Sequence, residues 1–292
     1  MNKAVRNIIG STLLLASLIS CTTTKVVSPI VNVVPLQSIA KEGDTLVVVD
    51  ATKEKALVSK LVGNTVADRA QRISVELTPK NDEYPLTSFD VNAVVEGDFP
   101  SFITRIGLAN LSGGKMIHTE AYNYYPYNGA QVGLINNNMV GFSTDSFSSL
   151  TTKVISKESS IDKSIILKLY DANIGLYSEK PVTLLELDLG LTKEMLTHID
   201  SLLILINEDK DCVTTLNATF DLDTNLSADL LSKMFKIGYI SYLKTEKIKP
   251  DYKVLKVMFT QEGDIVNISE MPMSDKKLKG LTDSITNNNL GL

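Results

Sequence analysis

Residues 46–50 read Leu46-Val47-Val48-Val49-Asp50, an apolar and mostly β-branched run that is typical of a buried strand. Thr52 follows this run and is a suitable N-cap for a helix. The residues that then recur at helical spacing are Ala56, Leu57, Lys60, Leu61 and Asn64. The folded part of the chain is therefore expected to begin with a strand that leads directly into a helix.

The pattern continues with further strands and helices as far as residue 155. Asn128-Gly129 is a strong signal for a tight hairpin, and Pro100 is well placed to start a helix that ends at Ser112-Gly113-Gly114. The expected elements are a short helix over 66–72, strands over 73–78 and 89–98, a helix from Pro100, a hairpin of 116–127 with 131–142, and a helix over 146–155.

The second part of the chain repeats this order. The expected elements are a strand over 184–189, a helix over 192–199, a hairpin of 202–206 with 213–222, a helix over 227–247, a hairpin of 254–260 with 265–269, and a helix over 274–285. Both parts read strand, helix, two strands, helix, two strands, helix, which indicates an internal duplication. The sequence thus predicts an α+β fold with mixed, mostly antiparallel sheets and amphipathic helices, in two tandem similar halves.

The first twenty residues have the features of a secretory signal. Lys3 and Arg6 precede an apolar run over 8–19, which is too short to span a bilayer. The run ends at Leu18-Ile19-Ser20-Cys21, which resembles the lipobox of bacterial lipoproteins. That resemblance implies that Cys21 is acylated on its thiol and becomes the mature N-terminus. The alternative is an ordinary signal with a cysteine there by chance.

The chain is accordingly divided into five parts. They are a lipoprotein signal peptide (1–20), an acylated cysteine and tether (21–43), a first α+β half (44–157), a linker (158–181) and a second α+β half (182–292). The linker contains Ile165-Ile166-Leu167-Lys168-Leu169-Tyr170, so it is either an extended connection along the sheet or a short amphipathic helix on the surface.

The composition argues against nucleic-acid binding, a further membrane span and a disulfide. The chain has 292 residues, 43% of them hydrophobic, and a net charge of −5, so it is a globular protein without the basic excess that nucleic acids require. No other apolar run is long enough to cross a membrane. Only Cys212 remains if Cys21 is acylated, so the mature chain cannot form an intramolecular disulfide.

Sequence motifs of catalysis and metal binding are missing. His118 and His198 have no partner at metal-ligand spacing. Asp221-x-Asp223-x-Asn225 begins like a calcium loop, but Leu226 and Ser232 stand where Gly and Glu are needed. We expect no enzyme activity, no catalytic residue, no metal and no cofactor.

The helix over 227–247 carries the clearest functional pattern. At 100° per residue its lysines fall within one narrow arc, while apolar residues occupy a much wider one. A basic stripe beside a broad apolar surface is typical of a helix that lies in a membrane interface. The alternative is a helix that packs on the sheet with its lysines in solvent, or one that does both. The candidate lipid-binding residues are Leu230, Leu231, Lys233, Met234, Phe235, Lys236, Ile237, Tyr242 and Lys244. Residues 165–170 are a second candidate.

The order of elements resembles the spirochaetal lipoproteins typified by the treponemal concealed outer-membrane protein. The resemblance extends from about Asp44 to Ile285 and implies a lipid-anchored α+β domain on the periplasmic side of the outer membrane. It also implies binding of phospholipid or fatty acid, insertion of amphipathic helices (here 52–62, 100–111 and 227–247) and altered permeability. Unlike a typical interfacial protein, this chain has no Trp. The landmarks are Asp68-Arg69, Gly97-Asp98-Phe99-Pro100, Leu111-Ser112-Gly113-Gly114, Gly141-Phe142-Ser143 and Glu262-Gly263-Asp264, together with the strand and helix at 46–61.

Three functions remain open from the sequence. The first is a non-enzymatic, lipid-anchored lipoprotein that interacts with or inserts into the outer membrane. The second is a periplasmic carrier of lipid or fatty acid, with a pocket lined by Met234, Phe235 and Ile237. The third is an envelope lipoprotein that binds a protein partner or has a structural role.

Overall fold

Strand β1 (Thr45–Asp50) forms from the valine run and lies inside a large antiparallel sheet. The computed structural model describes Leu36, Ile39 and residues 43–80, 89–119, 122–156, 161–179, 193–208 and 213–273. Leu46 and Val48 are fully buried on one side of β1, and Val47 and Val49 are buried on the other. A strand that is covered on both faces needs apolar residues at successive positions, which explains the run.

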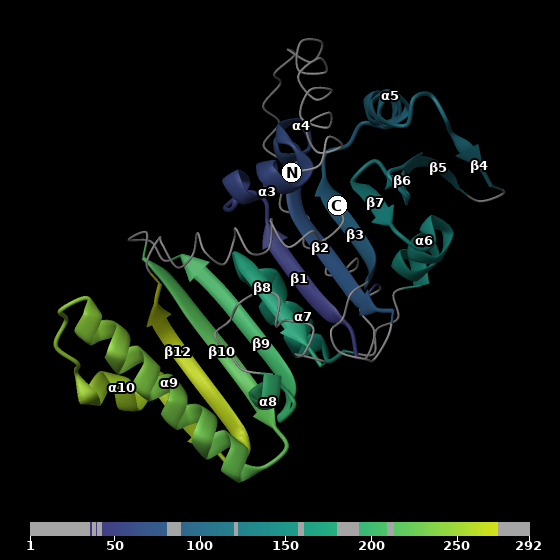
Figure 1. The fold of residues 1–292 in the computed structure, drawn as a ribbon. Helices are drawn as coiled ribbons and strands as arrows, with labels where there is room; N and C mark the ends of the chain where they lie inside the picture. Colours follow the sequence, from purple (N-terminus) through teal and green to yellow (C-terminus); the bar gives the residue numbers. More distant parts are fainter. Residues whose placement is uncertain are drawn as a thin grey trace.

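The described residues form twelve strands in one sheet, and every pair of neighbouring strands is antiparallel (Figure 1). The order across the sheet is β11-β12-β10-β9-β8-β1-β2-β3-β7-β6-β5-β4. Besides β1, the strands are β2 (Ala70–Pro79), β3 (Phe89–Gly97), β4 (Ile117–His118), β5 (Asn123–Tyr127), β6 (Ala130–Asn136), β7 (Met139–Ser143), β8 (Ile174–Ser178), β9 (Ile199–Glu208), β10 (Thr214–Leu222), β11 (Phe259–Glu262) and β12 (Ile265–Pro272).

Helices cover both faces of this sheet. Helices α3, α4, α8, α9 and α10 bury side chains with Val47 and Val49 on what we call the α9 face. Helices α6 and α7 bury side chains with Leu46 and Val48 on the opposite, α7 face. The described helices are α3 (Lys55–Val62), α4 (Asn64–Ala67), α5 (Ser101–Leu111), α6 (Phe147–Ser156), α7 (Lys163–Asp171), α8 (Lys193–Leu196), α9 (Asn225–Thr245) and α10 (Tyr252–Met258).

The sheet has an internal repeat centred on the β8–β1 pair, in which Leu176 faces Val47. Outward from this pair, the order β8-β9-β10-β12-β11 on one side matches β1-β2-β3-β7-β6 on the other. Helix α8 follows β8 as α3 follows β1, and α9 follows β10 as α5 follows β3. The α+β class and the tandem layout are therefore confirmed, with the second copy beginning at β8.

Of the segment expected as a linker, the described residues 161–179 form helix α7 and strand β8, so residues 165–170 are helical rather than an extended connection. Asp162 caps α7 by accepting a hydrogen bond of 2.6 Å from the backbone N–H of Ser164. Strand β8 then lies between β9 and β1 and is buried along its whole length. Its sequence, Ile174-Gly175-Leu176-Tyr177-Ser178, shows neither a polar alternation nor an uninterrupted β-branched run, so no local pattern marked it as a strand.

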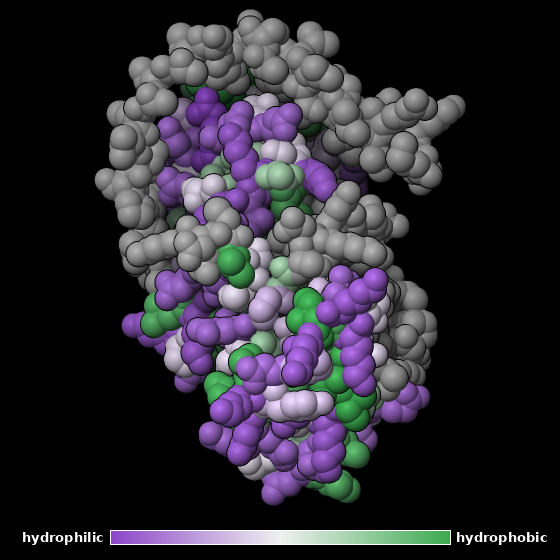
Figure 2. Space-filling view, turned by 90° about the vertical axis from the view of Figure 1, so that its left-hand side faces the viewer, coloured by the Kyte–Doolittle hydropathy of each residue, from purple (hydrophilic) through white to green (hydrophobic). Residues whose placement is uncertain are grey.

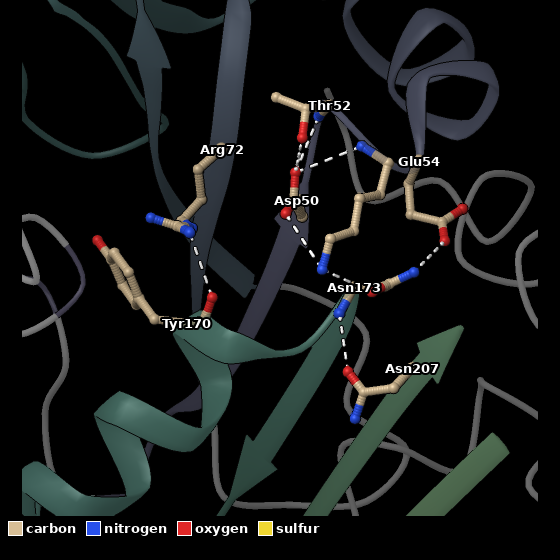
Figure 3. A network of polar contacts seen from close by, with 8 residues as sticks. Asp50, Thr52, Glu54, Arg72, Tyr170, Asn173 and Asn207 are labelled. Atoms are coloured by element: carbon tan, nitrogen blue, oxygen red, sulfur yellow. Dashed lines mark hydrogen bonds and ion pairs between the residues drawn. The ribbon is translucent and has the colours of Figure 1, made fainter. Parts of the chain in front are cut away.

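Polar side chains at the end of β1 connect the two copies (Figure 3). Asn173, just before β8, accepts a hydrogen bond from Lys53 Nζ at 3.0 Å, and its backbone carbonyl accepts one from the N–H of Asp50 at 2.8 Å. Its own backbone N–H lies 3.3 Å from the Asn207 side-chain oxygen on β9. The start of β8 is thus hydrogen-bonded to elements of both copies.

Among the elements expected in the first copy, one hairpin is confirmed and two boundaries differ. The hairpin at Asn128-Gly129 is confirmed, and both residues have the positive φ that its tight turn requires. The strand expected over 131–142 is wrong, because a turn at 137–138 divides it into β6 and β7. The helix expected over 66–72 ends earlier, since α4 stops at Ala67 and β2 begins at Ala70.

The strand expected over 254–260 is also wrong. These residues form α10 and only then enter β11. Asp251 accepts hydrogen bonds from the N–H groups of Lys253 and Val254, which starts the helix, and Leu255 and Met258 bury its inner side. The strand expected over 184–189, the helix over 274–285, Cys212 and the entire signal and Cys21 lie outside the described residues.

Candidate functional site

Helix α9 is anchored to the sheet by one side only. Thr224 caps its first turn by accepting a hydrogen bond of 3.1 Å from the N–H of Ser227. In its middle, the Phe235 ring packs at a tilt against Phe220 of β10, with ring centroids 5.0 Å apart. Tyr239 contacts Phe259 of β11 in the same way at 5.7 Å. These contacts fix the rotation of the helix about its axis.

The opposite side of α9 exposes an apolar stripe, which consists of Leu226, Leu230, Met234 and Ile237. Their spacing of four, four and three residues places them in one row along the helix. The exposed fractions are 70% for Leu226, 50% for Leu230, 44% for Met234 and 67% for Ile237. Large apolar side chains arranged in a row on a surface mark an interaction site more often than isolated ones do.

The candidate residues of α9 therefore divide into two groups. Leu231 is fully buried and Phe235 packs against the core, so these two hold the helix in place, while Tyr242 is half-buried beside Tyr239 of the same helix. Leu230, Met234 and Ile237 lie on the outer side. Because Met234 and Ile237 do not share a side with Phe235, the three do not line one pocket.

The three candidate lysines differ in their surroundings. Lys233 is exposed and pairs with Asp229 one turn earlier, with Nζ and Oδ2 2.6 Å apart. Lys244 is exposed near the end of the helix, whereas Lys236 is half-buried. Sequence reasoning treated the apolar arc as one surface. The boundary between the inner and outer sides could have been found from Phe235 and Tyr239, whose aromatic rings face the sheet.

Helix α10 continues this surface and was missed, because its residues were expected in a strand. It exposes Tyr252 (70%), Val254 (51%) and Val257 (72%), and Ile248 in the preceding turn is also exposed (51%). Lys253 and Lys256 are exposed between them. In Figure 2 hydrophobic residues are interleaved with hydrophilic ones in the lower part of the molecule, where α9 and α10 lie.

Helix α5 exposes a second apolar patch at the other end of the sheet. Phe102 is 76% exposed, and Ile103, Ile106 and Leu111 are exposed to a lesser extent. Before this helix, at the end of β3, Gly97 lies so close to Arg69 that a Cβ atom would overlap the Arg69 carbonyl group. Among the three helices carried over from the family resemblance, α5 and α9 have exposed apolar faces. In α3, by contrast, Leu57 and Val58 are buried in the core.

The second candidate, residues 165–170, packs inward. Ile166 and Leu169 of α7 are fully buried and Tyr170 nearly so, whereas Leu167 is 42% exposed. This helix mainly covers the α7 face of the sheet. One exposed leucine does not form an apolar surface.

Buried carboxyl groups lie behind α6 and α7. Burial raises the pKa of Glu96 to about 7, while the hydrogen bond from Tyr170 and the charge of Arg72 act in the opposite direction. Burial, with the neighbouring Glu76 carboxyl, also raises the pKa of Asp44 to about 7. Glu76 in turn accepts a hydrogen bond from Asn92 at 2.7 Å and pairs with Lys153 at 3.2 Å. These groups connect the helices to the sheet.

One of the two histidines belongs to a hydrogen-bonded pair with a carboxylate next to the start of α9. His198 lies 2.8 Å from Asp223, and this hydrogen bond lowers the pKa of Asp223. Within the described ranges no three His, Cys, Asp or Glu side chains are arranged to hold a metal ion. None of the helices described there is both long and apolar enough to span a bilayer.

The comparisons with known proteins concern the fold. The structure is similar to three crystal forms of the treponemal protein TP0453. Form I gives a TM-score of 0.60 at 11% identity, over 87% of this chain and 96% of that chain. Form III gives 0.58 at 11% identity, over 87% and 98%, and form IV gives 0.59 at 12% identity, over 86% and 96%. The two proteins thus share a fold over nearly their whole length.

No family model and no curated protein sequence matches the chain. The similarity to TP0453 agrees with the treponemal resemblance found in the order of elements. Sequence identity of this level shows the shared fold and leaves the function to be argued from the surface of this chain.

Proposed function

We propose that this chain is a non-enzymatic lipoprotein of the outer membrane, anchored by an acylated Cys21 and in contact with the periplasmic leaflet through α9. The observation that supports the contact is the two-sided helix. Its inner side packs on β10 and β11 through Phe235 and Tyr239. Its outer side presents four large apolar residues to solvent.

Transfer of the outer residues into a membrane is favourable and requires no opening of the fold. Burying a side chain of this size fully is worth about 1.5–3 kcal/mol. Scaled by the exposed fractions of 44–70%, each member of the stripe would contribute about 1–2 kcal/mol on entering the acyl region. Several such contributions are enough for reversible binding, which an acyl chain on Cys21 would make stable.

The carrier function has less support, because Met234 and Ile237 lie on the outside of α9 rather than around a pocket with Phe235. A role limited to protein binding would be favoured if the polypeptide does not bind vesicles.

The test is flotation on vesicles of an equimolar mixture of phosphatidylcholine and phosphatidylglycerol. A chain that starts at Lys25 keeps every described residue and lacks the signal and Cys21. It should float, and the double variant Met234→Ser, Ile237→Ser should float much less. The matched control is Ile155→Ser, Leu167→Ser, which removes two side chains with exposures of 60% and 42% from α6 and α7.

The control should float like the unchanged chain. Circular dichroism should show that both variants fold, because the side chains are exposed. If the unchanged chain stays at the bottom of the gradient, the polypeptide does not bind the membrane. A protein-binding role would then be favoured.

A further inference from the structure

Helices α9 and α10 carry a local positive charge that the rest of the chain does not share. Residues 225–258 contain seven lysines and three acidic residues, a net charge of +4 in a chain whose total is −5. The remaining residues therefore carry −9. A basic region on an acidic protein orients it toward an anionic surface.

Most of these lysines are available to a partner. Asp229 already pairs with Lys233, and Asp251 is engaged in capping α10. Within the part of the chain that the structure describes, the other six lysines make no ion pair. They are Lys236, Lys244, Lys247, Lys249, Lys253 and Lys256.

The turn between the helices keeps these charges on the same face of the sheet as the apolar stripe. Lys247 has φ 59°, and the N–H of Ile248 donates to the carbonyl of Leu243 at 2.8 Å, which ends α9 and reverses the chain. Asp251 then starts α10, whose Leu255 and Met258 pack in the same core as Leu231. The two helices therefore share one support.

Charged and apolar residues alternate on the exposed side of α10. Tyr252, Val254 and Val257 are exposed together with Lys253 and Lys256. A purely electrostatic surface for an acidic protein would not need large apolar side chains between its lysines. A lipid surface needs both, since the lysines meet headgroups and the apolar residues enter below them.

We infer that α9 and α10 together form a surface selective for anionic phospholipid headgroups. This inference rests on the proposed membrane contact and adds the chemical class of lipid and a second helix. Helix α5 provides an internal comparison, because it has an apolar patch but only one charged residue, Arg105, within 101–111. Selectivity for charge should therefore reside in α9 and α10.

The test compares vesicles of pure phosphatidylcholine with the equimolar phosphatidylcholine and phosphatidylglycerol vesicles, using the chain from Lys25. We expect tighter binding to the anionic vesicles, with a preference that weakens as salt screens the charges. The variant Lys253→Gln, Lys256→Gln should bind them about 25-fold more weakly, since each lysine at an anionic surface contributes about fivefold. Its binding to neutral vesicles should not change.

One control and one additional variant separate the role of this surface from that of total charge. Lys163→Gln, Lys168→Gln removes the same charge from α7 on the opposite face and should have little effect. The variant Lys244→Gln, Lys249→Gln leaves α10 unchanged. It should also weaken binding to the anionic vesicles, because both lysines belong to the same surface. Equal binding of the unchanged chain to both compositions would overturn the selectivity and leave the membrane contact intact. Failure to bind either composition would overturn both.

Discussion

The carboxyl group of Glu96 should make the stability of this protein depend on pH in an unusual direction. Glu96 is 3% exposed on β3 and accepts a hydrogen bond of 3.0 Å from the Tyr170 hydroxyl on α7. The Arg72 guanidinium lies over the Tyr170 ring, 4.1 Å from its centroid. Burial nevertheless dominates and raises the pKa of Glu96 from 4.5 to about 7.

The direction of the pH dependence follows from the number of protons that the folded and unfolded chains bind. Between the unfolded pKa of 4.5 and the folded value of about 7, the folded protein binds more protons than the unfolded chain. The free energy of unfolding therefore falls as pH rises through this window. Integration between about pH 5 and pH 8 gives a loss of about 2.5 kcal/mol attributable to Glu96. Asp44, whose pKa is raised in the same way, adds to the loss.

The perturbation is Glu96→Gln, which keeps the shape and an oxygen acceptor for Tyr170 but cannot ionise. Urea unfolding should be followed by circular dichroism, since the chain has no tryptophan, at several pH values from about 5 to 8. The difference in unfolding free energy between the two proteins should shift in favour of the variant by about 2.5 kcal/mol across this range. The contribution of Asp44 is common to both proteins and cancels.

Parallel stability curves for the two proteins would refute the reasoning. They would mean that Glu96 ionises in the folded state at its ordinary pKa, and hence that the contact of α7 with β3 is open to water. A constant offset between the curves does not matter, because the buried amide of the glutamine has its own cost at every pH.

Four further predictions concern packing and the anchor. Gly97→Ala should lower the free energy of unfolding by about 3 kcal/mol in urea titrations, because the added methyl group overlaps a backbone carbonyl. Gly107→Ala on α5, with no neighbour within 4 Å of its Cβ position, should be neutral or stabilise by about 0.5–1 kcal/mol. Phe235→Ala should cost about 2–3 kcal/mol in the same assay, whereas Ile237→Ala should stay within about 0.5 kcal/mol of the unchanged protein. Cys21→Ser should abolish incorporation of labelled palmitate in a bacterial host, and labelling that persists would exclude the lipobox interpretation.

The sequence contained enough information for elements that its local pattern specifies. Strand β1 and helix α9 were predicted because a run of valines favours a strand and a regular apolar spacing over about 20 residues favours a helix. The repeat was visible for the same reason, since it consists of the order of such elements. The starting point of the second copy was not visible, because Gly175 and Ser178 interrupt the apolar residues of β8, and the helix before it resembled a surface segment.

The errors near α10 have a physical cause as well. Residues 254–260 contain enough β-branched and apolar side chains for a strand. They form a helix instead because Leu255 and Met258 pack into the core from one side of it. Pro250-Asp251 was the available signal, since aspartate before such a run can cap it. For the same reason, the division of α9 into an inner and an outer side depends on Phe220 and Phe259, which belong to distant strands.

The two copies of the repeat show which properties the fold itself requires. Helices α5 and α9 occupy equivalent places after β3 and β10, and both expose large apolar residues on the outer side. The sheet needs only their inner sides, because exposed residues such as Ile237 and Phe102 add little to stability. Apolar outer faces at both places therefore call for an explanation outside folding, and contact with lipid supplies one. The copies differ in charge, since only the second continues into α10 with its lysines. A repeat that keeps its inner contacts can change its outer face without cost to the fold, so the second copy is where selectivity for a charged surface could arise.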